Sequence, residues 1–259
     1  MKLQKTSLVL GLFLGISSAY AASIDVYRES QTVEVPLETL VAPYHGYDNK
    51  NNVEVVLHGS LPNACYRLSK YTVERSQDRR KIRIHQYAVR NTDGVCAEEA
   101  LPIHLNMTVP FTNVVSLGSM APGDYTFAYQ SADDVAKYKT LNVKEAHKTT
   151  MDDFPYAAVS NASVSDVIQK NEKLSVTLSG VFTSSCAYLD NESVKVEKQK
   201  DVYVVLPVVK MKTGVYCLQT LIPFTQSVEM EAPKASGHYL VHVRSMNGKS
   251  VNRIVQALE

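Results

Sequence analysis

The sequence predicts an all-β chain that folds as two tandem β-sandwich domains. Three observations lead to this fold class. Cys65 and Cys96 are 31 positions apart, and Cys186 and Cys217 have the same spacing. Short segments that alternate apolar and polar residues recur, with turn signals roughly every 8–12 residues. No stretch sustains the i, i+3, i+4 apolar pattern of an amphipathic helix.

Each interval between cysteines predicts a β-hairpin. In the first interval, residues 81–84 alternate charged and apolar side chains, and a polar turn near Asp78 precedes them. In the second, residues 194–197 are expected to pair with residues 202–205. This alternation is the period-2 pattern of a half-buried strand, so the cysteines lie near the open end of each hairpin.

The repeat also favours one disulfide pairing. Four cysteines allow three connectivities. The shared spacing favours Cys65–Cys96 and Cys186–Cys217 over either crossed pairing. Each bridge closes a loop of about 32 residues and is expected to contribute roughly 3–4 kcal/mol on the chain-entropy model. Four free buried cysteines are the alternative.

Further matching segments extend the repeat through both copies. Strands 53–59 and 174–180 have the same alternation and end in glycine. They point one set of side chains inward: Val53, Val55, Leu57, Leu174, Val176 and Leu178. Two Pro-Phe strands begin at Pro110 and Pro223, and two Gly-x-Tyr strands begin at Gly123 and Gly237. A tight turn is expected at 247–248, an Asn-Gly pair.

The start of the chain predicts export. Residues 1–21 combine a basic start, a short apolar core and an Ala-x-Ala cleavage site, which together form a signal peptide. We expect sandwich domains at 22–143 and 157–259, joined by a polar linker at 144–156. No second long apolar run follows, so no membrane insertion is expected after cleavage. The expected location is the periplasm or the exterior, where disulfides persist.

The chain resembles the tandem immunoglobulin-like modules of exported bacterial proteins. The resemblance is carried by the strand-ending Gly59 and Gly180, the Pro-Phe strands and the Gly-x-Tyr strands. It covers about residues 24–259 and implies the fold alone, two tandem sandwiches. The chain departs from antibody-type domains because it has no tryptophan and because its cysteine spacing is too short for a bridge between two sheets.

Charge argues against nucleic acid as a partner. The chain has 27 basic and 26 acidic residues, and cleavage of the signal peptide removes two lysines. A near-neutral protein lacks the clustered positive charge that phosphate binding needs. The one dense basic run, residues 79–81, falls at a hairpin turn, where a solvated turn is a simpler interpretation than an anion site.

Motifs for catalysis and cofactors are missing. The sequence has no G-x-S-x-G, H-E-x-x-H, C-x-x-C or phosphate-binding glycine loop. His238 and His242 share a strand face, but their backbones are about 13 Å apart, too far to hold one ion together. We therefore expect no enzyme activity, no cofactor and no metal site, and we interpret all seven histidines as surface or edge residues.

Two segments differ between the copies and are candidates for partner binding. The first is an insertion within residues 97–109 that alternates large apolar side chains: Leu101, Ile103, Leu105 and Met107. An added edge strand that pairs with a partner chain is one interpretation. A strand buried in the domain's own sheet is the other.

The second segment is an aromatic loop at residues 44–47, which carries Tyr44 and Tyr47. Loop aromatics favour binding, although tyrosines that pack on the end of a sandwich are the alternative.

These observations favour a non-catalytic exported protein for binding, adhesion or envelope scaffolding. The expected partner is another protein or a cell-surface component. A pilus-type periplasmic assembly chaperone is the first alternative, although the two domains of such chaperones are dissimilar and these copies align closely. A protease inhibitor or an enzyme with an unrecognised site is the second.

Overall fold

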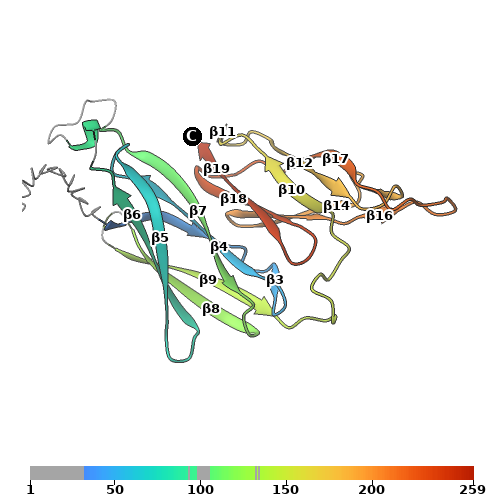
Figure 1. Cartoon of the computed structure of the whole chain (residues 1–259), viewed down its shortest axis with the longest axis horizontal. Helices are drawn as coiled ribbons and strands as arrows, with labels where there is room; N and C mark the ends of the chain where they lie inside the picture. Colours follow the sequence, from blue (N-terminus) through green and yellow to red (C-terminus); the bar gives the residue numbers. More distant parts are fainter. Residues whose placement is uncertain (1–31, 93, 98–105, 132, 134) are drawn as a thin grey trace, which may run out of the picture.

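A computed structural model describes residues 32–92, 94–97, 106–131, 133 and 135–259 (Figure 1). In this part of the chain the structure is nearly all β, and no helix is long and apolar enough to span a membrane. One hydrophobic core draws on residues 35–143 and a second on residues 157–257. We call the surrounding regions the N-terminal lobe, residues 32–144, and the C-terminal lobe, residues 156–259.

The N-terminal lobe is a sandwich of two sheets. One has the strand order β1-β6-β8-β9-β3, and β5 also pairs with β6. The second has the order β2-β4-β7. The strands are β1 (Thr32–Val35), β2 (Leu37–Val41), β3 (Tyr47–Asp48), β4 (Val53–Leu61), β5 (Tyr66–Arg75), β6 (Lys81–Arg90), β7 (Val109–Gly118), β8 (Gly123–Gln130) and β9 (Ala136–Lys144), with a short 3₁₀ helix η1 (Gly94–Ala97) after β6.

The C-terminal lobe has a five-stranded sheet of order β11-β19-β18-β15-β14, a three-stranded sheet of order β10-β12-β17 and a two-stranded ribbon of β13 and β16. Its strands are β10 (Ala158–Ser163), β11 (Val167–Gln169), β12 (Leu174–Phe182), β13 (Ala187–Tyr188), β14 (Val194–Gln199), β15 (Val202–Pro207), β16 (Lys210–Met211), β17 (Ile222–Met230), β18 (Gly237–Arg244) and β19 (Ser250–Leu258).

The two lobes share one pattern of strand pairing. In the N-terminal lobe β6 pairs with β8 in parallel, as does β3 with β9. In the C-terminal lobe the parallel pairs are β15 with β18 and β11 with β19. The other pairs between named strands are antiparallel in the part of the chain that the structure describes. The predicted all-β sandwich fold is confirmed.

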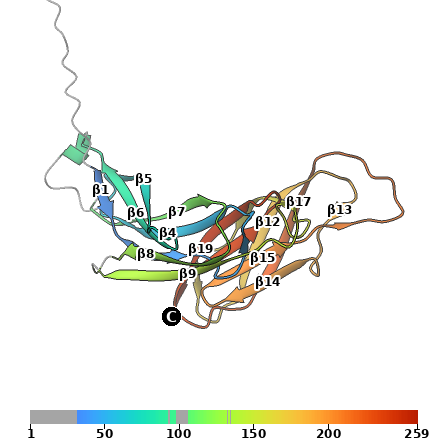
Figure 2. The same cartoon turned by 90° about the horizontal axis from the view of Figure 1, so that it is seen from below.

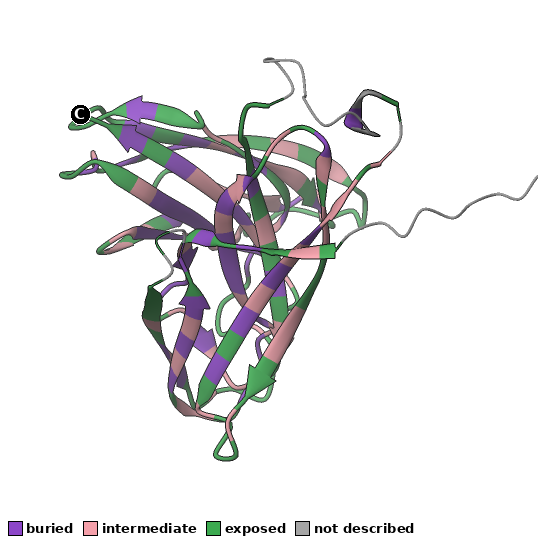
Figure 3. Ribbon diagram, turned by 90° about the vertical axis from the view of Figure 1, so that its left-hand side faces the viewer, coloured by how far each residue is buried: buried purple, intermediate pink, exposed green. Residues whose placement is uncertain are grey.

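Alternation of side chains builds both cores, as Figure 3 shows by the alternating buried and exposed bands along the strands. The inward-facing residues predicted for the central strands are all buried: Val53, Val55, Leu57, Leu174, Val176 and Leu178. The Gly-x-Tyr strands behave alike, with Tyr125 and Phe127 in one core and Tyr239 and Val241 in the other.

The two strand-ending glycines are explained by close packing. A Cβ atom on Gly59 would lie 2.9 Å from the Pro36 carbonyl oxygen and 3.0 Å from the Phe111 ring. On Gly180 it would lie 2.1 Å from the Ala158 carbonyl oxygen and 3.0 Å from the Phe224 ring. Each glycine therefore lets the phenylalanine of a Pro-Phe strand approach the backbone.

Both disulfides that the repeat predicts are present, with Cα–Cα distances of 5.6 Å for Cys65–Cys96 and 5.4 Å for Cys186–Cys217. The first closes the β5–β6 hairpin, since the Asn91 amide donates to the Cys65 carbonyl oxygen at 2.8 Å. The expected turn at 247–248 is also confirmed, because Asn247 and Gly248 have φ values of 64° and 67°.

The lobes pack against each other sheet to sheet. Strands β2 and β4 of the N-terminal lobe face β15, β18 and β19 of the C-terminal lobe. Between them lies a third apolar cluster of Val41, Val56, Val202, Val204 and Leu240, flanked by Leu206 and Ile254. Both faces of β18 are consequently covered, and residues 237–244 alternate between the lobe's own core and this inter-lobe contact.

Segment 145–155 connects the lobes without strand structure. It is hydrogen-bonded to both of them. The side chains of Lys50 and Asn51 donate to the carbonyl oxygens of Thr149 and Met151, at 2.7 and 2.9 Å. The Asp152 carboxylate accepts hydrogen bonds from the backbone amides at the 247–248 turn. The segment that the sequence predicts as a linker is therefore attached along its length.

Candidate functional site

The loop of residues 212–221, between β16 and β17, exposes an unusual number of large apolar side chains. Tyr216 is 87 % exposed and Leu221 is 70 % exposed, and Met211, Val215 and Leu218 are also exposed. The loop extends beyond the sandwich at the end of the C-terminal lobe that is remote from the N-terminal lobe (Figures 1 and 2). We call residues 211–221 the apolar loop.

Covalent and backbone contacts fix the base of the apolar loop. The disulfide ties Cys217 to Cys186, at the start of the β13 ribbon. The Lys212 amide donates to the Cys186 carbonyl oxygen at 2.9 Å, and the Ser185 amide donates to the Leu218 carbonyl oxygen at 3.0 Å. These contacts hold both ends of the loop, so its side chains are displayed from a defined support.

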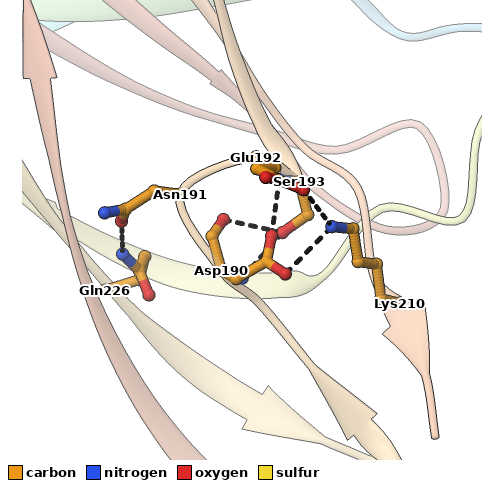
Figure 4. Close-up of polar contacts among 6 residues, drawn as sticks. All are labelled: Asp190, Asn191, Glu192, Ser193, Lys210 and Gln226. Atoms are coloured by element: carbon orange, nitrogen blue, oxygen red, sulfur yellow. Dashed lines mark hydrogen bonds and ion pairs between the residues drawn. The ribbon is translucent and has the colours of Figure 1, made fainter.

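A polar turn supports the same ribbon (Figure 4). The Lys210 ammonium lies 2.9 Å from the Asp190 carboxylate and 3.3 Å from that of Glu192. Asp190 also accepts a 2.8 Å hydrogen bond from the Ser193 amide. The Lys210 contact lowers the pKa of the Asp190 carboxyl below its usual range, and the same contact raises the pKa of Lys210. The turn and β16 are therefore joined electrostatically beside the loop.

A pocket of about 470 Å³ opens at the base of the apolar loop. Its lining includes Met211 of the loop itself. Aromatic and aliphatic side chains from β12, the ribbon and the connecting segment complete much of the wall, among them Phe154, Tyr156, Phe182, Ala187 and Val209. Apolar protrusion and apolar recess thus lie side by side, as in surfaces that bind another protein through a few buried anchors.

The second candidate surface is a pocket of about 460 Å³ where the lobes meet. Tyr44 and Tyr138 line it, and both are exposed. Lys139 also lines the pocket, and its ammonium pairs with the Asp201 carboxylate of the other lobe at 2.7 Å. Tyr44, which the sequence predicts as a partner-binding residue, is therefore at the surface beside a pocket.

Tyr47 requires a correction. It is 2 % exposed, so its side chain is not available to an external partner. Its hydroxyl donates to the Glu54 carbonyl oxygen at 3.0 Å, and its ring contacts the His242 ring at a centroid distance of 5.3 Å. Burial raises the pKa of the Tyr47 hydroxyl. Tyr47 instead packs within the fold, as in the alternative interpretation of this loop, and its ring contacts the second lobe.

His242 is also corrected, because it is fully buried and not a surface histidine. Its Nδ1 lies 2.8 Å from the Asn252 Oδ1, and the Asn252 Nδ2 donates to the Glu54 carboxylate at 2.8 Å. The Ser250 hydroxyl donates to the same carboxylate. Burial lowers the pKa of His242 to about 4, and the Arg244 charge acts in the same direction. The imidazole is therefore neutral at physiological pH.

Three potential metal ligands meet at the lobe contact, where the sequence predicted none. Glu38, His58 and His238 have one ligand atom each within 4.8 Å of one another. Glu38 and His58 belong to the N-terminal lobe, whereas His238 belongs to the C-terminal lobe. Sequence reasoning compared His238 with His242 on the same strand, and no local pattern indicates that His238 meets a histidine of the other copy.

Three of the predicted partner residues, Leu101, Ile103 and Leu105, lie outside the described residues. Met107 is exposed. The apolar loop was not singled out from the sequence. Its one signal is the cluster of apolar residues around Cys217, a cysteine that the sequence analysis placed near the open end of a hairpin.

A model of the ORF11 beta-sandwich domain matches residues 55–142, from β4 to β9 of the N-terminal lobe. This similarity covers about a third of the chain and agrees with the sandwich found there. Searches of curated proteins and of solved structures found no match.

Proposed function

We propose that this protein is an exported, non-catalytic protein-binding module built from a duplicated immunoglobulin-like sandwich. Its principal contact surface is the apolar loop. The observation that carries this proposal is the exposure of five large apolar side chains within residues 211–221, on a loop that a disulfide holds at its base. Adhesion or envelope scaffolding is the role that such a module serves.

Energetics favour binding over a solvent-exposed role. Burial of one Leu, Val or Met side chain contributes about 1.5–3 kcal/mol, so four or five of them can supply a large part of a protein–protein affinity. A loop that is already ordered loses less conformational entropy on association than a free segment does. The disulfide between Cys186 and Cys217 and the ribbon supply that order.

The two disulfides are compatible with an oxidising compartment. Together with the signal peptide expected at residues 1–21, they support the periplasm or the exterior as the site of action. A protein or a cell-surface component in that compartment is the proposed partner.

Capture of partners after in-cell cross-linking tests the proposal. The tagged chain is recovered from periplasmic and outer-membrane fractions, beside a Tyr216→Ser/Leu218→Ser/Leu221→Ser variant. A matched control, Tyr71→Ser/Val114→Ser, changes exposed apolar residues of the other lobe that line neither candidate surface. Loss of a dominant partner from the loop variant, with retention by the control, supports the proposal. Equal capture by the loop variant and the unchanged chain contradicts it.

A second candidate function is protease inhibition, which one observation favours. Tyr216 projects into solvent immediately before the disulfide-bonded Cys217, so an aromatic side chain stands on a constrained, exposed segment. A serine protease with a deep apolar specificity pocket is the matching target. Tight, Tyr216-dependent inhibition of chymotrypsin supports this function, whereas rapid cleavage of the loop without inhibition argues against it.

A further inference from the structure

We propose that Glu38, His58 and His238 form a binding site for a divalent transition-metal ion, with Zn²⁺ as the expected occupant, and that the ion joins the two lobes. The site lies on β2, β4 and β18. It shares no residue with the apolar loop, so it stands or falls independently of the proposed function.

Geometry brings the three side chains within reach of one ion. The rings of His58 and His238 have centroids 4.3 Å apart, inclined at 48°. The Nε2 atom of His58 lies 3.8 Å from a Glu38 carboxylate oxygen. Zinc bonds of about 2.0–2.2 Å place neighbouring ligand atoms roughly 3–3.5 Å apart. Small side-chain rotations therefore convert the observed separations, all within 4.8 Å, into a coordination shell.

Two of the three ligands are held by a second partner. The Nδ1 of His58 lies 3.2 Å from the Thr112 hydroxyl, which leaves Nε2 facing the site. The Ser60 hydroxyl donates to the Glu38 carboxylate at 2.6 Å. Metal-binding histidines and carboxylates are commonly oriented by such outer contacts. These contacts orient the side chains of His58 and Glu38, so the three ligands are more than neighbours in space.

The chemistry of the donor set suits zinc. Imidazole nitrogen and carboxylate oxygen are both good ligands for this ion. The two rings lie side by side, and a cation between them and Glu38 would bind to all three groups.

An ion at this position has a structural consequence. It links the N-terminal lobe, through Glu38 and His58, to the C-terminal lobe, through His238. Three protein ligands leave a fourth tetrahedral position for water or for a side chain from a partner. The metal therefore adds a cross-link at the edge of the lobe contact, beside the apolar cluster that already joins the sheets.

Zinc titration of the full exported chain tests the proposal. The tag is removed, metal is stripped with EDTA, and ZnCl₂ binding is measured by calorimetry with MgCl₂ as the comparison ion. We expect one Zn²⁺ per chain with a dissociation constant of micromolar order or tighter, and no comparable Mg²⁺ binding. Because an ion that binds only the folded state stabilises it, we also expect a hundredfold excess of Zn²⁺ over the dissociation constant to raise Tm by roughly 5 °C or more.

Variants locate the site. His58→Gln and His238→Gln should each weaken Zn²⁺ binding at least tenfold and abolish the rise in Tm. Glu38→Gln, at an exposed position that is tolerant of change, should weaken binding without altering the fold. His85→Gln is the matched control, because His85 lies beside Glu34 and Glu74 but outside the triad, and it should bind like the unchanged chain.

Coordination is checked separately with CoCl₂, whose visible absorption intensifies when the ion becomes four-coordinate. An intense spectrum that disappears in His238→Gln supports a site shared between the lobes. Absence of stoichiometric Zn²⁺ binding, or equal loss of binding in His85→Gln and His58→Gln, overturns the proposal.

Discussion

The two cystine-closed hairpins have the same cysteine spacing but enclose different structures. In the N-terminal lobe the interval is filled by two ten-residue strands, β5 and β6. In the C-terminal lobe the paired strands β14 and β15 have six residues each. The residues left over form the 190–193 turn, the β13–β16 ribbon and much of the apolar loop. One scaffold thus carries a regular hairpin in one copy and a protruding loop in the other.

This difference separates structure from function within a repeat. The elements common to both copies are those that the fold needs, namely the alternating strands, the close-packed glycines and the disulfides. The apolar loop and the histidines of the lobe contact are not repeated in both copies. The fold of a single sandwich therefore does not account for them.

Removal of the disulfides should have the largest effect and should separate the two hairpins. Equal loop lengths predict equal chain-entropy losses, of about 4 kcal/mol each. Cys65 and Cys96 are both buried, whereas Cys217 is exposed. Cys65→Ala/Cys96→Ala should therefore lose roughly 1 kcal/mol more than Cys186→Ala/Cys217→Ala, because it also leaves a cavity. Urea unfolding of both variants measures the difference, and a larger loss in the second contradicts it.

The matched glycines should respond unequally to alanine. At Gly180 the added methyl group meets a backbone oxygen at 2.1 Å, whereas at Gly59 the closest approach is 2.9 Å. Overpacking of this kind costs about 1–3 kcal/mol. We expect Gly180→Ala to lose roughly 3 kcal/mol and Gly59→Ala roughly 1 kcal/mol in the free energy of unfolding. Equal midpoints in denaturant for the two variants would show that the backbone at Ala158 moves away as easily as the backbone at Pro36.

His242 should make the stability of the chain sensitive to acid. Ala128 aligns with it when Gly123 is matched to Gly237, and alanine has no side chain that titrates. Burial lowers the folded pKa from 6.5 to about 4, so between these values the unfolded chain binds more protons than the folded chain. Stability is therefore unaffected above about pH 6.5 and falls as the pH drops towards 4, by up to about 3 kcal/mol. The measurement is urea unfolding at several pH values, in which His242→Gln should lose less stability over this window than the unchanged chain.

Substitution within the apolar loop should have the smallest effect on stability. Tyr216 and Leu218 are exposed and contribute little to the core. Tyr216→Ser/Leu218→Ser should change the free energy of unfolding by less than about 0.5 kcal/mol. A thermal melt checks this expectation. A drop of several degrees in Tm would mean that the loop packs against the lobe and is not a free surface.

Local patterns in the sequence predicted the strands, their buried faces and the disulfide pairing, because alternation and repetition are readable over a few residues. The contact between the lobes could not be predicted from local alternation alone. Strand β15 carries an uninterrupted apolar run, Val202 to Leu206, which is typical of a strand buried on both faces, and this signal was available. The meeting of His58 with His238 was not, since it depends on how two separate sheets pack.

The two-sided burial of the C-terminal sheet also affects how the two lobes fold. In a chain exported as proposed, the N-terminal lobe enters the oxidising compartment first and can fold there before the second lobe arrives. Its strands β2 and β4, with Val41 and Val56 on the outer face, are then available as a template when β15 and β18 form. A C-terminal lobe made alone presents Val202, Val204 and Leu240 to solvent and is prone to aggregate. Each lobe therefore covers an apolar face of the other, and neither face is covered until both lobes have formed.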